Sequence, residues 1–206
     1  MPIPRALPCG LAAVLLLAAC GDPAGPDADL TRADAEALAT ELHGVAAGVM
    51  EGSLVFPSFS TAGGGGVLAT VTRNESFTRT VQCPGGGNVE VQGRVTSTVD
   101  HATRTATRVT EATRVENACV VSVRDGATMT LNGAPSTAMR AEHGVANGVP
   151  GKHTMTQKGA FTWKRSTGQS GTCSIDVVSV HDPATRTSTV NGTVCGRTVS
   201  VTRTRP

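Results

Sequence analysis

The sequence predicts a mainly β protein: an antiparallel meander that forms a curved sheet or incomplete barrel, with one N-terminal helix packed on it. Apolar and polar residues alternate from about Leu68 to the C-terminus, as in strands with one buried face. Gly, Asn, Asp and Pro pairs separate these stretches in the way that hairpins require. Only Thr31 to Met50 has a helical period, so no helical crossovers are available for a parallel sheet.

The N-terminus has the pattern of an export signal. Met1 to Arg5 carries one positive charge, and Ala6 to Ala19 is almost wholly apolar. A membrane-spanning helix needs about 20 apolar residues, so this run is too short to span a bilayer. A charged start followed by an apolar run of this length is typical of a signal peptide.

The apolar run ends in Leu17-Ala18-Ala19-Cys20, which resembles the lipobox of bacterial lipoproteins. The resemblance covers the first 21 residues. It implies cleavage after Ala19, a diacylglyceryl group on the thiol of Cys20, and attachment to the membrane through that lipid. The alternative is an ordinary secretory signal, which requires a small residue at the third position before the cut. Leu17 is too large for that position if the cut follows Ala19, so such a signal would be cut after Gly21.

We therefore expect an exported chain that is lipid-anchored to the cell envelope, at the outer membrane and facing the periplasm or the cell surface. The expected segments are a signal peptide at 1–19, a Gly/Pro/Asp-rich tether at 20–30, an amphipathic helix at 31–50 and a β segment at 51–206. The helix and the β segment should form one domain.

The helix is predicted by its start signal and its apolar spacing. Thr31-Arg-Ala-Asp34 is a near capping box, with Asp in place of the usual Glu. Leu38, Leu42, Val45 and Val49 then recur on one side, which should lie against an apolar surface.

The clearest strand is Asn88 to Asp100, where valines alternate with polar residues. Further strands are expected at Glu75–Gln82, Arg104–Val115, Cys119–Val123, Ala127–Leu131, His153–Lys164, Gly171–Val180, Arg186–Val194 and Arg197–Thr204. Turns are expected at Pro84–Gly87, Asp125–Gly126, Asn132–Gly133, Asn147–Gly151, Asp182–Pro183 and Asn191–Gly192. Asp100–Thr105 and Asp182–Thr187 share five of six residues, and of the two interpretations, an internal duplication or the same turn chemistry used twice, we favour the second.

The cysteine count agrees with export. Cys9 leaves with the signal and Cys20 takes the lipid, so Cys83, Cys119, Cys173 and Cys195 remain. An even number in an oxidising compartment indicates two disulfides, with three connectivities open. Neighbours in a meander are neighbours in space, so we expect Cys83 to pair with Cys119 and Cys173 with Cys195. A zinc site would require closely spaced cysteine pairs, which the sequence lacks.

No catalytic, cofactor or metal motif is present, so we expect a protein that is not an enzyme and has no cofactor. The five histidines are scattered, and no two are spaced at i, i+2 or i, i+4. Nucleic acid is a poor candidate partner, because the exported chain has few aromatic side chains to stack on bases. Composition leaves the oligomeric state open.

Charge is divided unevenly along the chain. Cys20 to Pro57 has seven acidic residues and one basic residue, a net charge of −6, whereas Ser58 to Pro206 has sixteen basic and nine acidic residues, a net charge of +7. Arg104, Arg108 and Arg114 occupy even positions of one predicted strand, so they could line one face. We hypothesise that this face contacts anionic envelope polymer or lipid. The alternative is a merely solvated face.

Two functions follow from this architecture. The first is a non-enzymatic binding or structural module, as in the many uncharacterised β-rich lipoproteins of bacterial envelopes, which the chain resembles in outline. The second is a carrier of an acyl chain or other hydrophobic ligand, since the outline also resembles the half-barrel lipid carriers. An empty cavity lined by Val and Leu would favour the carrier. A sheet face filled by the helix would favour the module.

Overall fold

The computed structural model describes residues 30–51, 70–123, 126–133 and 136–204. The predicted signal peptide, Cys20 and almost all of the tether lie outside the described residues, as do the Val49 side chain and Asp125. The elements are α1 (Arg32–Glu51), β1 (Thr70–Gln82), β2 (Asn88–Asp100), β3 (Thr105–Asn117), β4 (Cys119–Ser122), β5 (Thr128–Gly133), β6 (Thr137–Ala146), β7 (Val149–Arg165), β8 (Ser170–Asp182), β9 (Thr187–Val194) and β10 (Arg197–Thr204).

All strand pairs are antiparallel, in the order β1-β2-β3-β6-β7-β8-β9-β10, and β4 pairs with β5. Both β5 and β6 pair with β7, on successive parts of its length. β3 runs into β4 through Ala118, which has a positive φ of 49°. Two interrupted strands, β3–β4 and β5–β6, therefore form one long hairpin. The topology is the predicted meander.

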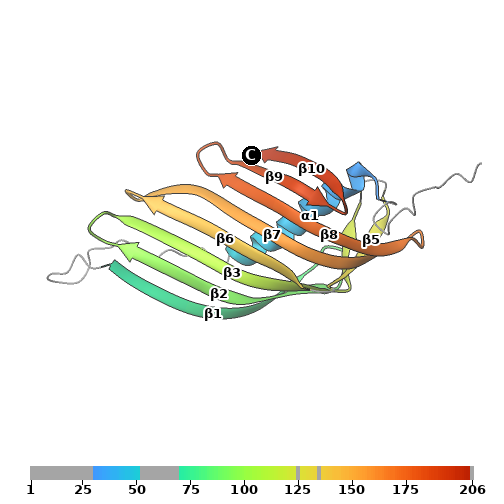
Figure 1. Ribbon diagram of the computed structural model, residues 1–206, viewed down its shortest axis with the longest axis horizontal. Helices are drawn as coiled ribbons and strands as arrows, with labels where there is room; N and C mark the ends of the chain where they lie inside the picture. Colours follow the sequence, from blue (N-terminus) through green and yellow to red (C-terminus); the bar gives the residue numbers. More distant parts are fainter. Residues whose placement is uncertain (1–29, 52–69, 124–125, 134–135, 205–206) are drawn as a thin grey trace, which may run out of the picture.

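The sheet is curved and open. Within the described residues, β1 pairs only with β2 and β10 pairs only with β9, so the sheet does not close. Figure 1 shows α1 lying across one face of the sheet. We call this the inner face and the opposite one the outer face. The predicted curved sheet with a helix packed on it is confirmed.

The start of α1 is fixed by a capping box and an ion pair. Thr31 Oγ1 accepts a hydrogen bond from the Asp34 backbone N–H (3.1 Å), and Thr31 N–H donates to Asp34 Oδ2 (3.3 Å). The same carboxylate accepts two hydrogen bonds from the guanidinium of Arg165 at the end of β7 (3.2 and 3.4 Å). Both side chains of this pair are almost fully buried. Asp34 thus joins the first turn of the helix to the sheet.

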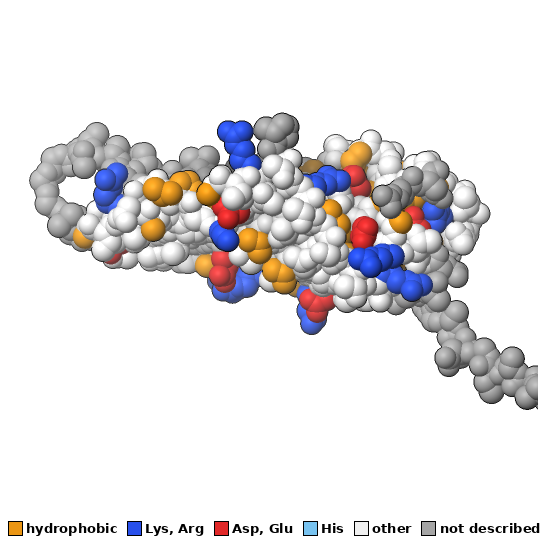
Figure 2. Space-filling model, turned by 90° about the horizontal axis from the view of Figure 1, so that it is seen from above, with side chains coloured by type: hydrophobic (Ala, Val, Ile, Leu, Met, Phe, Trp, Pro, Cys, Tyr) orange, Lys and Arg blue, Asp and Glu red, His pale blue; other side chains and the backbone are white. Residues whose placement is uncertain are grey.

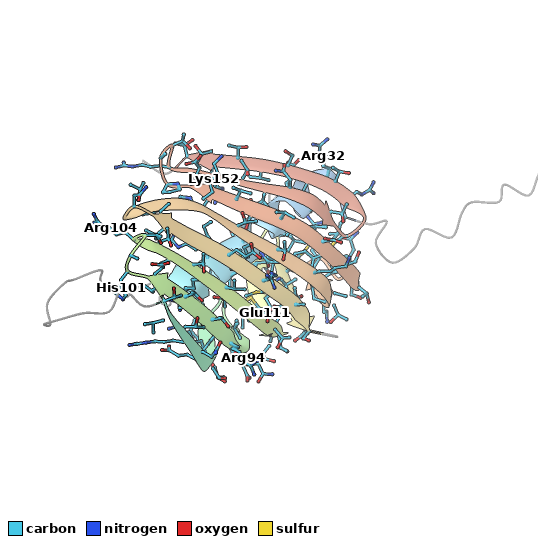
Figure 3. All side chains as sticks on the ribbon, turned by 60° about the vertical axis from the view of Figure 1, so that its left-hand side comes forward. Arg32, Arg94, His101, Arg104, Glu111 and Lys152 are labelled. Atoms are coloured by element: carbon cyan, nitrogen blue, oxygen red, sulfur yellow. A yellow bond between two sulfur atoms is a disulfide. The ribbon has the colours of Figure 1, made fainter. Side chains whose placement is uncertain are left out.

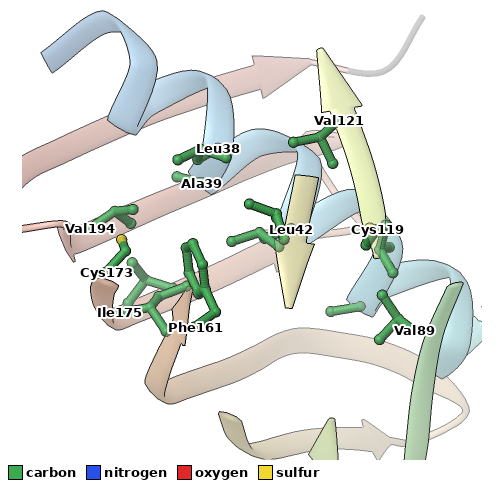
Figure 4. Packing of buried hydrophobic residues seen from close by; sticks show 14 of the residues in the cluster. Leu38, Ala39, Leu42, Val89, Cys119, Val121, Phe161, Cys173, Ile175 and Val194 are labelled. Atoms are coloured by element: carbon green, nitrogen blue, oxygen red, sulfur yellow. The ribbon is translucent and has the colours of Figure 1, made fainter. Parts of the chain in front are cut away.

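The core lies between α1 and the inner face. Leu38, Ala39 and Leu42 of the helix are buried beside Phe161 and Ile175 of the sheet, as Figure 4 shows. Most other core positions are Val, Ala, Leu or Met, since the chain has only four Phe, one Trp and no Tyr. These small side chains alone do not fill the space on the inner side of the curved sheet, and the apolar side chains of α1 complete the core.

The two related turns are built alike. Asp100 Oδ1 accepts hydrogen bonds from the backbone N–H of Ala102 and Thr103, and Asp182 Oδ1 accepts one from Ala184. Arg104 and Arg186 occupy the same place in each turn, with φ values of 52° and 53°. The prediction of one turn chemistry used twice is consistent with this geometry.

Three predictions about the strands were incomplete or wrong. β6 was not predicted, because Ala138, Glu142 and Gly144 on its outer face are poor strand formers. Asn132-Gly133 is no hairpin turn, since β5 and β6 lie along the same side of β7. Asn191-Gly192 lies within β9, and the turn into β10 is at Cys195-Gly196, where φ is 51° and 69°.

Both expected disulfides are present, Cys83 with Cys119 and Cys173 with Cys195. The first joins the β1–β2 turn to the start of β4, and the second joins β8 to the β9–β10 turn. Both lie at one end of the sheet, which we call the disulfide end. The β2–β3, β6–β7 and β8–β9 turns lie at the other end, which we call the turn end.

We predict that each disulfide stabilises the fold by about 3 to 4 kcal/mol, because it closes a loop in the unfolded chain. The loops span 36 and 22 residues. Replacing Cys83 and Cys119 together by Ala should therefore lower the free energy of unfolding in urea by that amount. An unchanged unfolding midpoint would show that the cross-link does not constrain the unfolded chain.

Candidate functional site: a basic row across the inner face

The outer face is polar and its charges are largely paired. Arg140 lies 2.7 Å from both Glu111 and Glu142, and Lys158 lies 2.9 Å from Asp176. Figure 2 views the molecule from the β9–β10 edge, and on that side basic and acidic side chains are interspersed, with no large area of a single sign. Exposed ion pairs of this kind add little stability, but they neutralise the surface locally. The net positive charge of the β segment does not form a uniform basic outer face.

Arg114 was predicted to lie on an exposed basic face, and this prediction was wrong. Its side chain points to the inner face, is 1% exposed and forms an ion pair with Glu116 at 2.8 Å. It also donates hydrogen bonds to the carbonyl of Leu42 in α1 (3.2 Å) and to Gln157 (2.6 Å). Burial lowers the pKa of Arg114, and the Glu116 carboxylate opposes that shift. Arg114 holds the helix to the sheet and cannot touch a surface partner.

Arg104 and Arg108 have different places. Arg104 is exposed in the β2–β3 turn, before the strand begins, and Figure 3 shows it at the turn end near His101 and Lys152. Arg108 does lie on the same side of β3 as Arg114, as the even positions predicted. That side is the inner face, and there Arg108 is only half-buried.

The strand register places Arg108 in a line of polar residues that crosses the whole inner face. Each of the eight strands of the meander contributes one residue, and each residue lies directly opposite the next. We call this line the inner row. From β1 to β10 it consists of Arg73, Ser97, Arg108, His143, His153, His181, Ser188 and Arg203.

The inner row lies near the turn end, and its β9–β10 end meets α1. On the disulfide side, the core that includes the helix reaches Ala141, Met155 and Val190. On the other side, Val99, Ala106 and Val145 form a separate small cluster without helix residues. Every member of the row is half-buried or exposed. The row is thus a polar strip between two apolar patches, and it is partly open to solvent.

Three histidines form the centre of the row. The rings of His143 and His153 have centroids 5.8 Å apart, with planes tilted by 39°. His181 Nδ1 lies 2.9 Å from Ser188 Oγ, within hydrogen-bonding distance. Burial, and then the positive charges of Arg108 and His181, lower the pKa of His143. The neutral imidazole of His143 is therefore favoured near neutral pH.

The arginines of the row are not paired with carboxylates in the part of the chain that the structure describes. Among the described residues, Arg73, Arg108 and Arg203 form no ion pair with an acidic side chain. Arg108 Nε is shielded from solvent and has no hydrogen-bond partner in the described structure. Burial lowers the pKa of Arg108, while Glu75 on β1 acts in the opposite direction. The row itself contains no acidic residue, so it suits an anionic ligand.

The arginines of the row disfavour a cation beside the histidines, because their charges on both flanks would repel it. Within the ranges that the structure describes, no three His, Cys, Asp or Glu side chains are placed to hold a metal ion. A cleft of about 300 Å³ lies where the row meets α1, lined by Ser188, Val190, Val201 and Arg203 of the sheet and by the Thr40–Gly48 part of the helix. This cleft makes the surface concave at the β9–β10 end of the row.

Sequence reasoning missed the histidine group, although a signal for part of it existed. In a hairpin, the two residue numbers of every directly opposite pair have the same sum, and that sum is fixed by the position of the turn. A turn near Gly168 places His153 opposite His181, as observed. His143 could not be added to them, because its strand was not predicted.

No known protein family, curated protein or solved structure matches the chain. None of the helices among the described residues combines the length and the apolar character needed to cross a membrane.

We predict that Arg114→Met, which leaves the Glu116 carboxylate buried without its partner, lowers the free energy of unfolding by about 3 to 5 kcal/mol. Replacing Arg114 and Glu116 together by Met and Leu should be much less harmful. Arg94→Met, on the exposed outer face, serves as control and should change stability by less than about 0.5 kcal/mol. Equal stability of the Arg114 and Arg94 variants in urea would refute the structural role of Arg114.

Proposed function

We propose that this protein is a lipid-anchored, non-enzymatic binding module of the bacterial envelope, and that its inner row binds an anionic envelope polymer. The observation that carries the proposal is the row of three arginines and three histidines without an acidic member. Basic side chains without counter-charges attract an anionic partner and raise its rate of association.

A carrier function has less support. Leu38 and Leu42 of the helix, and Leu30 just before it, fill the disulfide side of the inner face, each about 1% exposed or less. A cavity lined by Val and Leu would have favoured an acyl-chain carrier. The cleft beside α1 instead carries Arg203, Ser188 and His43 on its lining, and an acyl chain has no group to pair with them.

The shape of the row favours a polymer over a membrane surface. Neighbouring strands lie about 4.8 Å apart, so eight residues in line extend over roughly 34 Å. The row lies on the face that carries α1, where a flat bilayer would meet the helix first. An extended chain of phosphate or carboxylate groups can follow the line of strands between the helix and the turn end.

The proposed anchor is compatible with this partner. Arg197 Nε at the start of β10 donates a hydrogen bond to the carbonyl of Leu30 (3.1 Å), so the chain enters α1 at the disulfide end. The row lies toward the opposite end, because Arg203 follows Arg197 by six residues on β10, or roughly 20 Å along the strand. A lipid on Cys20 would therefore join the chain at the end of the sheet that lies away from the row.

The proposed lipidation of Cys20 should yield a mature protein of defined mass. Intact mass of the membrane-extracted protein should show loss of residues 1–19 and the addition of two or three acyl chains, because two or more chains are needed for firm anchoring. Cys20→Ala should leave an uncleaved precursor. A soluble product that begins at Asp22 would instead show an ordinary secretory signal.

Binding is predicted to depend on charge. The mature chain with Cys20→Ser, made without lipid and with its disulfides formed, should bind dextran sulfate at low salt. The affinity should fall steeply as the Debye length shrinks from about 10 Å at 0.1 M salt to about 3 Å at 1 M. Replacing Arg73, Arg108 and Arg203 by Gln should weaken binding by about tenfold or more, which corresponds to about 1.4 kcal/mol.

The control is Arg94→Gln, which removes an exposed arginine from the outer face. It should leave the affinity nearly unchanged. Equal losses in the two variants would show that net charge matters and that the row does not. Sedimentation with anionic vesicles at the same affinity as with the polymer would replace the polymer by a lipid surface.

A further inference from the structure

The centre of the inner row consists of three imidazoles in consecutive register, and this arrangement has a consequence for pH. His143 lies opposite His153 in the β6–β7 pair, and His153 lies opposite His181 in the β7–β8 pair. Residues directly opposite each other in antiparallel strands have Cβ atoms about 4.5 to 5.5 Å apart. Charges on all three rings would therefore repel one another strongly.

The groups around the histidines are mainly basic. Within the described structure, β1 contributes Arg73 and Glu75, β3 contributes Arg108, and β10 contributes Arg203. Arg79 of β1 also acts on Arg108 through its charge. From α1, His43 lines the cleft beside Ser188 and Arg203. Glu75 is the one acidic side chain in this set, so protonation of the imidazoles would add positive charge beside residues that are mainly basic.

We propose that the inner row is an acid-strengthened anion site, in which His143, His153 and His181 gain protons as an anionic polymer binds. This inference rests on the proposed function and adds its regulation. At pH 8 only the arginines hold the polymer, whereas near pH 5.5 up to three further positive charges face it. The polymer supplies the counter-charges that the row lacks, and the imidazoles bind protons more readily in its presence.

In the protein without polymer, acid has the opposite effect, because protonation of His143 lowers the stability of the fold. The pKa of His143 is lowered in the folded state, so the unfolded chain binds a proton at a higher pH than the folded chain does. Stability is therefore fully present above the unfolded value of about 6.5 and is lost as the pH falls through the folded pKa. A bound polyanion should reverse this loss, because it stabilises the protonated rings.

The test uses the mature chain with Cys20→Ser and dextran sulfate, whose sulfate charge does not change in this pH range. Dissociation constants are measured at pH 5.5 and pH 8.0 at equal ionic strength. The expected result is binding at least about tenfold tighter at pH 5.5. Replacing His143, His153 and His181 by Gln should abolish that ratio and leave the binding at pH 8.0. His101→Gln, in the exposed β2–β3 turn, is the matched control and should keep the ratio.

A second measurement does not depend on the triple variant being folded. The imidazole pKa values of the native chain are followed by NMR with and without polymer, and those of the row should rise on binding while that of His101 stays nearly constant. Polymer binding of equal strength at both pH values, with unmoved pKa values, would overturn the pH dependence and leave the proposed function standing. No binding at either pH would overturn both. Tight Zn²⁺ binding at pH 8.0 that the triple variant loses would make the row a metal site instead.

Discussion

The packing of α1 on the inner face is the interaction on which the rest of the structure depends, and Asp34 determines where it begins. One carboxylate caps the first turn of the helix and pairs with Arg165 at the end of β7. A buried carboxylate tolerates this position only because both its charge and its lone pairs are matched. The helix therefore starts at the disulfide end. It covers the apolar residues there and leaves the polar strip near the turn end uncovered by the helix core.

Features that depend on local sequence could be predicted. The capping box, the alternation of Asn88 to Asp100 and the turn at Asn147-Gly148 each involve residues close in the chain, and all are present. The disulfides followed from the meander, since consecutive hairpins place their cysteines near one another. β6 could not be predicted, because its strand character comes from pairing with β3 and β7 on both sides.

The candidate site could be predicted only in part. Even spacing correctly placed Arg108 and Arg114 on one side of a strand, but it cannot tell which side the helix covers or where its cover ends. Arg114 is buried with its charge paired to Glu116 and with Nη1 donating to Gln157 and to a helix carbonyl. Arg108, six residues earlier on the same face, lies outside the helix core. This difference arises from the length and direction of α1, which the strand sequence does not contain.

The contrast between the inner-row arginines and the paired charges elsewhere in the described structure is the strongest physical argument for a function. On the outer face, Arg140 and Lys158 have carboxylates beside them, although water would screen their charges well in any case. On the inner face, Arg114 and Arg165 are also paired with carboxylates. Arg108, where burial makes charge more costly, forms no ion pair within the described structure. Folding alone would favour the reverse arrangement. Residues that oppose stability in this way are typical of sites where binding supplies the missing interaction.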